Sequence, residues 1–261
     1  RKIIAEDMRK MGLIEKIYEN YTHTIEVCYK CGTTIEPMLL PQWFIKMRLL
    51  AKPAIDAVKK GKIKIFPKRF EKIYFQWIDN LRDWNISRQV WYGHRIPIWY
   101  KDTQIFCGMD APRDDGWIQD EDTLDTWFSS ALWTFSTLGW PEETEDLRTY
   151  HPTDVLETGY DIIFFWVARM ILMTTYHLGD IPFKKVYLHG LVRDAEKQKM
   201  SKSRGNIVDP LEMIGQYGAD ALRMGLIVGN PPGNDLALSQ DKVKGHKHFA
   251  NKIWNASRFV I

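Results

Sequence analysis

The fold is decided by residues 154–192, DVLETGYDIIFFWVARMILMTTYHLGDIPFKKVYLHGLV. Two short runs suited to β-strands, residues 154–158 and 185–192, flank a long apolar stretch that is predicted to be a helix beginning at Asp161. Strand, helix and strand joined by short turns form a βαβ unit, and such units build parallel sheets with a right-handed crossover. We therefore predict an α/β fold whose ligand site lies at the carboxyl ends of the strands.

Both predicted strands end in residues that are unusual for a simple turn. The first is followed by Gly-Tyr-Asp at 159–161, and the second ends in His-Gly at 189–190 before the loop KQKMSKSRGN at 197–206. Asp-Pro-Leu-Glu at 209–212 predicts a helix start directly after this loop. Flexible lysines in such a loop can supply positive charge to phosphate groups, whereas a solvated basic loop is the alternative interpretation.

Upstream of this unit, the sequence predicts two helices and a strand. Apolar residues recur at helical spacing from Pro41 to Gly61, and Pro53 is expected to restart or kink this helix. A short strand is predicted at 63–65, and a second amphipathic helix from Lys68.

Composition limits the class of protein. The 261 residues are 45% hydrophobic and 26% charged, and 36 basic against 33 acidic residues leave a net charge of +3. These values exclude a disordered or collagen-like chain, and the net charge alone does not indicate a nucleic-acid partner. The most apolar run, residues 162–179, contains Arg169 at its centre, so we predict a buried helix and no membrane span. Three cysteines are too few for a disulfide scaffold, and we expect a cytoplasmic protein.

Five segments carry a resemblance to a known family. Residues 199–203, Lys-Met-Ser-Lys-Ser, match the second signature of the class I aminoacyl-tRNA synthetases, and Gly-Asn follows at 205–206 as in the valine, isoleucine and leucine enzymes. DWNISRQVWYGHRIP at 83–97 resembles the segment by which this subgroup re-enters its Rossmann domain after the editing insertion. LDTWFSSALW at 124–133 and TGYDIIFFW at 158–166 resemble the valine-specific members, and the Gly-x-Asp-Gln-His pattern of isoleucine enzymes is not found in the latter segment.

The resemblance extends over nearly the whole chain and implies a domain organisation. It implies the second half of a Rossmann-type parallel-sheet catalytic domain, followed by a helical stem-contact region and the start of an α-helical anticodon-binding domain. The implied parts are the end of the editing insertion or a connector (1–40), the catalytic half-domain (41–195, with an acidic surface insertion at about 100–123), the signature loop with the stem-contact region (196–238) and the first anticodon-domain helix (239–261). The first Rossmann half and the editing pocket would lie outside this chain, so we expect the chain alone to be inactive.

The resemblance also implies an activity and residue roles. The full-length enzyme would be monomeric, would use ATP and Mg²⁺ to convert valine to valyl-adenylate, and would transfer the valyl group to tRNA(Val). Lys202 is the lysine implied to stabilise the departing pyrophosphate, with Lys199 assisting and Ser201 and Ser203 shaping the loop. The residues implied to bind ATP are Lys202, Met200, Gly159, Asp161, His189 and Gly190. The tryptophans implied to wall the valine pocket are Trp127 and Trp166.

Each of these roles has a structural alternative. Asp161 is also suited to cap a helix, His189 to be a hydrogen-bonded structural histidine, and both tryptophans to be ordinary core residues in a chain with 11 tryptophans. Cys28-x-x-Cys31 has the spacing of half a zinc knuckle, but the sequence offers no second half, so we expect no structural zinc and no other metal site.

Three rival functions remain at this stage. An isoleucyl- or leucyl-tRNA synthetase would share the class and mechanism. A non-catalytic RNA-binding protein derived from a synthetase would share the fold. A basic interaction module of unrelated fold would require all the motif matches to be chance.

Overall fold

The fold is that of a computed structural model of the chain, which describes residues 2–18, 20–28, 31–201 and 205–261. The chain forms two compact units, Arg1–Pro41 and Gln42–Ile261. The described residues of the first unit include the helix α1 (Lys2–Lys10) and an isolated antiparallel bridge between Val27 and Thr34. The central sheet and the apolar core lie in the second unit.

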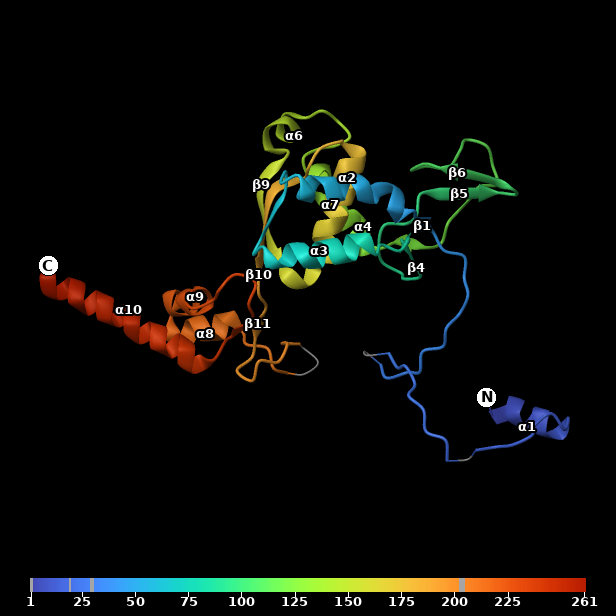
Figure 1. The fold of residues 1–261 in the computed structure, drawn as a ribbon, viewed down its shortest axis with the longest axis horizontal. Helices are drawn as coiled ribbons and strands as arrows, with labels where there is room; N and C mark the ends of the chain where they lie inside the picture. The colour runs from blue at the N-terminus through green and yellow to red at the C-terminus, as the bar shows by residue number, and fades with distance from the viewer. Residues whose placement is uncertain (1, 19, 29–30, 202–204) are drawn as a thin grey trace. The chain divides into compact units, whose positions relative to one another are not determined.

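A three-stranded parallel sheet is the centre of the second unit (Figure 1). Its strands lie in the order β2 (Lys64–Phe66), β10 (Phe183–His189) and β9 (Thr153–Gly159). Strand β10 is the middle strand, and its Val186 and Leu188 side chains are fully buried. The predicted βαβ unit, its parallel sheet and the short strand β2 are confirmed.

The predicted extension of the second strand to Val192 is wrong. Strand β10 ends at His189, and residues Val192–Arg193 form a separate strand, β11, which pairs with β12 (Leu236–Ala237). At Gly190 the chain leaves its pairing with β9 and β2, and two residues later it pairs with β12. The backbone of Asn234 lies so close to Gly190 that no side chain would fit there.

The helix predicted from Asp161 consists of three different pieces. A 3₁₀ turn, η1 (Tyr160–Ile162), leads into a π-helical turn, η2 (Ile163–Ala168), and then into the α-helix α7 (Arg169–His177). The prediction of one continuous α-helix is therefore wrong, although the apolar segment is largely buried as expected. The wider π turn carries three consecutive aromatic rings with three different partners: Phe164 stacks on Trp77, Phe165 stacks on Trp127, and Trp166 packs at a tilt against Trp133. Such π turns occur frequently at functional sites.

Two further helices pack around this unit. Helix α2 (Met47–Lys59) packs against α7, and α3 (Arg69–Asp79) packs against η2 (Figure 1). The predicted start of α2 near Pro41 is wrong, because β1 (Phe44–Ile45) comes first and pairs antiparallel with β3 (Trp84–Asn85). The helix instead begins where the Met47 N–H donates to Asp83 Oδ1 (3.2 Å), and Pro53 lies inside it without ending it.

The core between these elements is continuous and apolar. Tyr74 is buried in it, its hydroxyl donates to the Ala54 carbonyl oxygen (3.1 Å), and burial raises the pKa of that hydroxyl. The other core side chains come from all the elements around the sheet and include Met47, Ala57, Ile63, Ile65, Phe70, Ile78, Ala131, Val167, Met170, Ile171, Leu172 and Phe183.

The acidic stretch forms small antiparallel pairings instead of an irregular loop. Strands β6 (Gln104–Cys107), β5 (Ile98–Lys101) and β7 (Ile118–Gln119) make one sheet in that order, and β4 (Ser87–Arg88) pairs with β8 (Thr123–Leu124). Three short helices follow, α4 (Thr126–Ala131), α5 (Trp133–Ser136) and α6 (Glu145–Tyr150), of which α4 and α5 contribute buried side chains.

The last third of the chain is mostly helical. Asp209 caps α8 (Pro210–Tyr217) by accepting from the Leu211 N–H (2.8 Å), which confirms the predicted helix start after the loop. Helix α9 (Ala219–Ile227) and the long α10 (Gln240–Val260) pack with α8 around a second apolar cluster, which includes Met213, Leu222 and Val243. Among the described residues, no helix is both long and apolar enough to cross a membrane.

Candidate active site

The carboxyl ends of β9 and β10 bring three predicted ATP-binding residues together. Gly159 and His189 lie opposite each other as the last pair of the parallel ladder. The Asp161 carboxylate folds back over Gly159, so that a Cβ atom at position 159 would lie 2.7 Å from Asp161 Oδ1. Gly159 therefore leaves space that the carboxylate occupies. The alternative role of Asp161 as a helix cap is wrong, because the 3₁₀ turn begins after Gly159 and has no side-chain cap.

His189 is held through both ring nitrogens. Its Nδ1 lies 2.7 Å from the Gly190 carbonyl oxygen, and its Nε2 lies 3.2 Å from Glu157 Oε1 on strand β9. This is the hydrogen-bonded arrangement expected of a structural histidine, and it fixes the ring beside Gly159.

Gly190 lies very close to the backbone of Asn234, a segment of the same chain. A Cβ atom at this position would lie 1.7 Å from the Asn234 carbonyl oxygen. A glycine is therefore required here because the backbone of Asn234 and Asp235 lies against it, at a position where the family resemblance implied contact with ATP.

Asp235 joins these strand ends and was missed by the sequence analysis. Its carboxylate accepts from the Leu191 N–H (2.9 Å), from Arg193 Nε and from the Tyr160 hydroxyl. Partial burial opposes ionisation of Asp235, but these three donors outweigh it and lower the pKa of the carboxyl group. No local sequence signal pairs an acid at 235 with a strand end at 191, so only the fold reveals this contact.

The signature loop is closed by two side chains at its base. Asp194 accepts from the Gln198 N–H (2.6 Å) and from Asn206 Nδ2 (2.7 Å), and Asn206 Oδ1 accepts from the Ser201 N–H (2.9 Å). Lys199 pairs with Arg193 in an antiparallel bridge. These bonds position the described part of the signature, Lys199 to Ser201, whereas the predicted residues Lys202 and Ser203 lie outside the described residues. Asp194 was also missed, although an acid just after a strand end is a detectable signal.

The two predicted pocket tryptophans lie on adjoining segments, α4 and η2. The Trp127 ring stacks on Phe165 with centroids 5.7 Å apart. Trp166 Nε1 donates to the Ser130 carbonyl oxygen (3.0 Å), and its ring packs at a tilt against Trp133. Both tryptophans are half-buried and contact the core, so they are partly core residues and partly available to a ligand.

A buried ion pair lies next to these tryptophans. Arg169 Nη1 lies 3.6 Å from Asp125 Oδ2, and the two side chains are 9% and 7% exposed. Asp125 Oδ2 also accepts from Trp84 Nε1 (2.9 Å) and from Arg88 Nη2 (3.0 Å). Burial lowers the pKa of Arg169 to about 10, against the opposing effect of Asp125. The sequence analysis noted Arg169 only as a charge in an apolar run.

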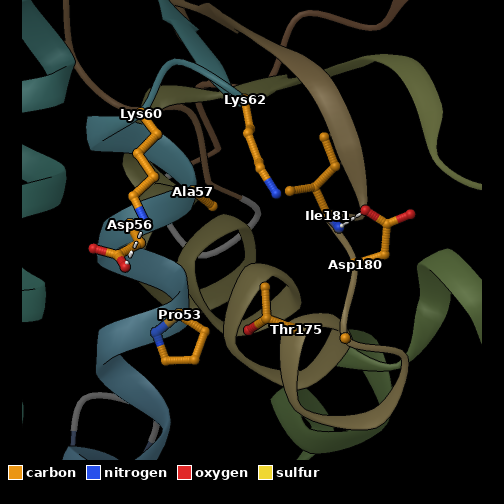
Figure 2. A pocket seen from close by; sticks show the side chains of 9 residues that line it. Pro53, Asp56, Ala57, Lys60, Lys62, Thr175, Asp180 and Ile181 are labelled. Atoms are coloured by element: carbon orange, nitrogen blue, oxygen red, sulfur yellow. Dashed lines mark hydrogen bonds and ion pairs between the residues drawn. The ribbon is translucent and has the colours of Figure 1, made fainter.

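Two cavities lie in this part of the chain. One of about 610 Å³ borders the buried pair and is lined by Trp77, Trp84, Arg88, Phe164 and Arg169, among others. The other, of about 230 Å³, lies between α2 and the residues after α7, and Figure 2 shows Lys60 turned toward Asp56 there, with an ion pair of 3.1 Å. Its residues Lys62 and Ile181 precede β2 and β10, so this second cavity lies at the amino ends of the strands. Ligands of parallel sheets bind at the opposite ends.

The cysteine pair lies in the first unit. Hydrogen bonds with Thr33 lower the pKa of the exposed Cys31 thiol to about 7, and Cys28 contributes in the same direction. Within the described ranges, no group of three or more His, Cys, Asp or Glu side chains is placed to hold a metal ion.

Comparisons with known proteins place this geometry in a family. The chain is 57% identical over 269 residues to a valine–tRNA ligase of Clostridium acetobutylicum and 56% identical to that of Clostridium tetani, in each case over 100% of this chain. It spans about 30% of the length of these relatives.

Solved structures share the fold. A methionyl-tRNA synthetase of Mycobacterium tuberculosis in complex with methionyl-adenylate aligns with a TM-score of 0.63 at 22% identity, covering 84% of this chain and 39% of that one. A LeuRS of Agrobacterium radiobacter K84, solved as a ternary complex, aligns with a TM-score of 0.59 at 21% identity, covering 67% of this chain and 28% of that one. Both confirm an α/β fold of the class I synthetase type.

The family model of class I tRNA synthetases (I, L, M and V) matches residues 9–113 and 109–239, which include both strand ends, both tryptophans and the signature loop. The chain belongs to this family of class I tRNA synthetases.

Proposed function

We propose that this chain is a catalytic segment of a valine–tRNA ligase, which activates valine with ATP and transfers the valyl group to tRNA(Val). The observation that carries the proposal is the identity of 52–57% over the whole chain to valine–tRNA ligases. The grouping of Gly159, Asp161 and His189 at the strand ends, beside the loop that begins at Asp194, supports it. The rest of the active site would come from a preceding half of the Rossmann domain, in a monomeric cytoplasmic enzyme.

In the first step, the valine carboxylate attacks the α-phosphate of ATP and pyrophosphate departs. Lys202, assisted by Lys199, would neutralise the charge that develops on the pyrophosphate, and Ser201 and Ser203 would shape the loop around it. The Asp194–Asn206 hydrogen bond would hold the base of this loop. Positioning and electrostatics carry such a reaction, with little acid–base chemistry.

The nucleotide would lie across the ends of β9 and β10. Asp161 would accept a hydrogen bond from a ribose hydroxyl, and Gly159, which lacks a side chain, would leave room for the carboxylate in this position. His189, Gly190 and Met200 would border the adenine. Mg²⁺ would accompany the ATP phosphates, and no residue of this chain is assigned to it.

Trp127 and Trp166 would form the walls of the valine pocket. A branched aliphatic side chain offers only shape and apolar contact, which rigid aromatic rings can match. Such a pocket rejects threonine poorly, so accurate attachment of valine to tRNA requires an editing site, which would lie outside this chain. Residues 196–238, the signature loop and the stem-contact region, would contact the tRNA stem, and 239–261 would begin the anticodon-binding domain.

The test uses a chimaera in which this chain replaces the matched segment of the Clostridium acetobutylicum enzyme. We expect valine-dependent exchange of pyrophosphate into ATP, with isoleucine, leucine and threonine as poorer substrates. Lys202→Ala should slow the exchange by about 10²- to 10³-fold, because one preorganised charge at the transition state is lost. Lys184→Ala, which removes an exposed lysine on β10 far from the loop, is the matched control.

Three outcomes would contradict parts of the proposal. Exchange that prefers isoleucine or leucine would change the substrate. A folded chimaera with no exchange for any amino acid would favour a non-catalytic RNA-binding role. Near-normal exchange in the Lys202 variant would remove the role given to that lysine.

A further inference from the structure

The two segments that carry the proposed pocket tryptophans are also the segments that carry the buried ion pair. Asp125 lies two residues before Trp127, and Arg169 lies three residues after Trp166. The pair therefore bridges the start of α4 and the junction of η2 with α7, the two segments that carry the tryptophans.

Asp125 fixes the start of α4. Its Oδ1 accepts from the Trp127 N–H (3.3 Å) and so caps the helix at the residue that bears the ring. Its Oδ2 accepts from Trp84 and Arg88 and faces Arg169. One carboxylate thus holds the backbone of Trp127 and the guanidinium beyond Trp166 at the same time.

Arg169 fixes the rings of the π turn. Its guanidinium carbon lies 3.8 Å from the centroid of the Trp84 ring and 5.6 Å from that of Phe165, with Phe164 at 5.4 Å. Phe165 in turn stacks on Trp127. Within the described part of the chain, Arg169 Nε and Nη1 have no hydrogen-bond partner, so the rings and the Asp125 carboxylate are what hold this side chain.

A hydrogen bond connects η2 to the other end of α4. Trp166 Nε1 donates to the Ser130 carbonyl oxygen (3.0 Å), so α4 and η2 are joined on both sides of the two tryptophans. The separation of the rings therefore depends on the ion pair at one end and on this hydrogen bond at the other.

We propose that Asp125 and Arg169 are positioning residues that set the spacing of Trp127 and Trp166, and thereby the fit of a branched aliphatic amino acid between them. This inference rests on the proposed function of the two tryptophans. An apolar side chain gains affinity only by shape, so a small change in the spacing of the walls weakens its binding without touching the nucleotide.

The first experiment measures KM for valine and for ATP in the pyrophosphate exchange reaction of the chimaera. Arg169→Met keeps the length of the side chain but removes the charge and the planar group. We expect the KM for valine to rise about 10-fold, whereas the KM for ATP stays within about twofold. Arg169→Lys should recover part of the loss, because it restores the charge but not the stacking.

Matched controls separate positioning from general damage. Lys184→Met removes a lysine of an exposed ion pair with Asp154 and should leave both KM values unchanged. Trp166→Ala, which removes a proposed wall directly, should give at least as large a rise in the KM for valine as Arg169→Met.

The second experiment reports on the rings without using activity. The chimaera is labelled with 5-fluorotryptophan, and the ¹⁹F resonances of Trp127 and Trp166 are assigned with the Trp127→Phe and Trp166→Phe variants. Arg169→Met should shift or broaden both resonances, and Lys184→Met should leave them in place.

The outcomes distinguish this inference from the proposed function. An unmodified chimaera without valine-dependent exchange contradicts the proposed function. An active chimaera in which Arg169→Met raises the two KM values equally, or leaves the valine KM and the ¹⁹F resonances unchanged, overturns the positioning role alone.

Discussion

Among the described residues, the arginine–aspartate pairs Arg169–Asp125 and Arg193–Asp235 each join distant segments, and they differ mainly in burial. The side chains of Arg169 and Asp125 are 9% and 7% exposed, whereas those of Arg193 and Asp235 are 26% and 24% exposed. Burial lowers the pKa of Arg169, but the hydrogen bonds with Asp235 and Tyr160 raise the pKa of Arg193. The aspartate raises the pKa of the arginine in both pairs, and the net direction differs because loss of water around Arg169 outweighs the effect of Asp125.

This difference in burial predicts that loss of the aspartate lowers the free energy of unfolding more in the buried pair than in the exposed pair. In the buried pair, removal of Asp125 leaves the mostly buried Arg169 guanidinium without a carboxylate, and little water reaches it. In the exposed pair, water can replace a lost partner, so the pair contributes less to the free energy of unfolding. Four variants test this comparison in the 261-residue chain.

Asp125→Ala should have the largest effect. It leaves Arg169 and Arg88 without their carboxylate, removes the partner of Trp84 Nε1 and uncaps α4. We expect the free energy of unfolding to fall by about 3–5 kcal/mol, as is typical when one partner of a buried pair is lost. Urea denaturation followed by circular dichroism measures this change.

The control for that variant is Asp154→Ala. Asp154 forms an exposed ion pair with Lys184 and is 82% exposed, so its loss should produce no measurable change. A similar loss of stability in both variants would show that burial does not determine the contribution of these pairs.

Asp235→Ala should have an intermediate effect. It removes the acceptor for the Leu191 N–H, for Arg193 and for Tyr160, all at the partly exposed ends of the strands. We expect a loss of about 1–2 kcal/mol in the same urea measurement. A loss equal to that of Asp125→Ala would contradict the comparison.

The pH dependence of Asp235 should be the smallest effect. Its pKa is lowered from the ordinary value of 3.8, so its ionised form stabilises the folded chain above about pH 4. That contribution should disappear as the pH falls through the lowered pKa. The difference in urea midpoint between the unmodified chain and Asp235→Asn should therefore narrow from pH 6 to pH 3, and a constant difference would show that Asp235 does not titrate in this way.

Local signals in the sequence predicted much of the fold. The βαβ unit, strand β2 and the helix start after Asp209 depend on periodicity and on a cap within a few residues. The single long helix from Asp161 and the strand end at Val192 were wrong for a common reason. The π turn follows the packing of its aromatic rings on other segments, and β10 ends where residues 231–235 cross it.

The candidate site was predicted in part. The side-by-side arrangement of Gly159, Asp161 and His189 follows from the rule that parallel strands present their carboxyl ends together. Asp194, Asp235 and the buried pair were missed, because a single acidic or basic residue has no local signature of its partner. Asp235 reaches the Leu191 N–H across 44 residues of sequence.

The amino-acid sequence by itself determined the parallel βαβ unit, the start of α8 after Asp209 and the signature motif, because each depends on residues that are close together in the chain. Only the tertiary structure decided that Arg169 is buried against Asp125 and three aromatic rings. The tertiary structure also decided that Asp235 accepts a hydrogen bond from the Leu191 N–H and that the Asn234 backbone lies against Gly190. Side chains lose water only when distant segments pack together, and this loss of water changes the pKa of each charged group and the strength of its ion pairs.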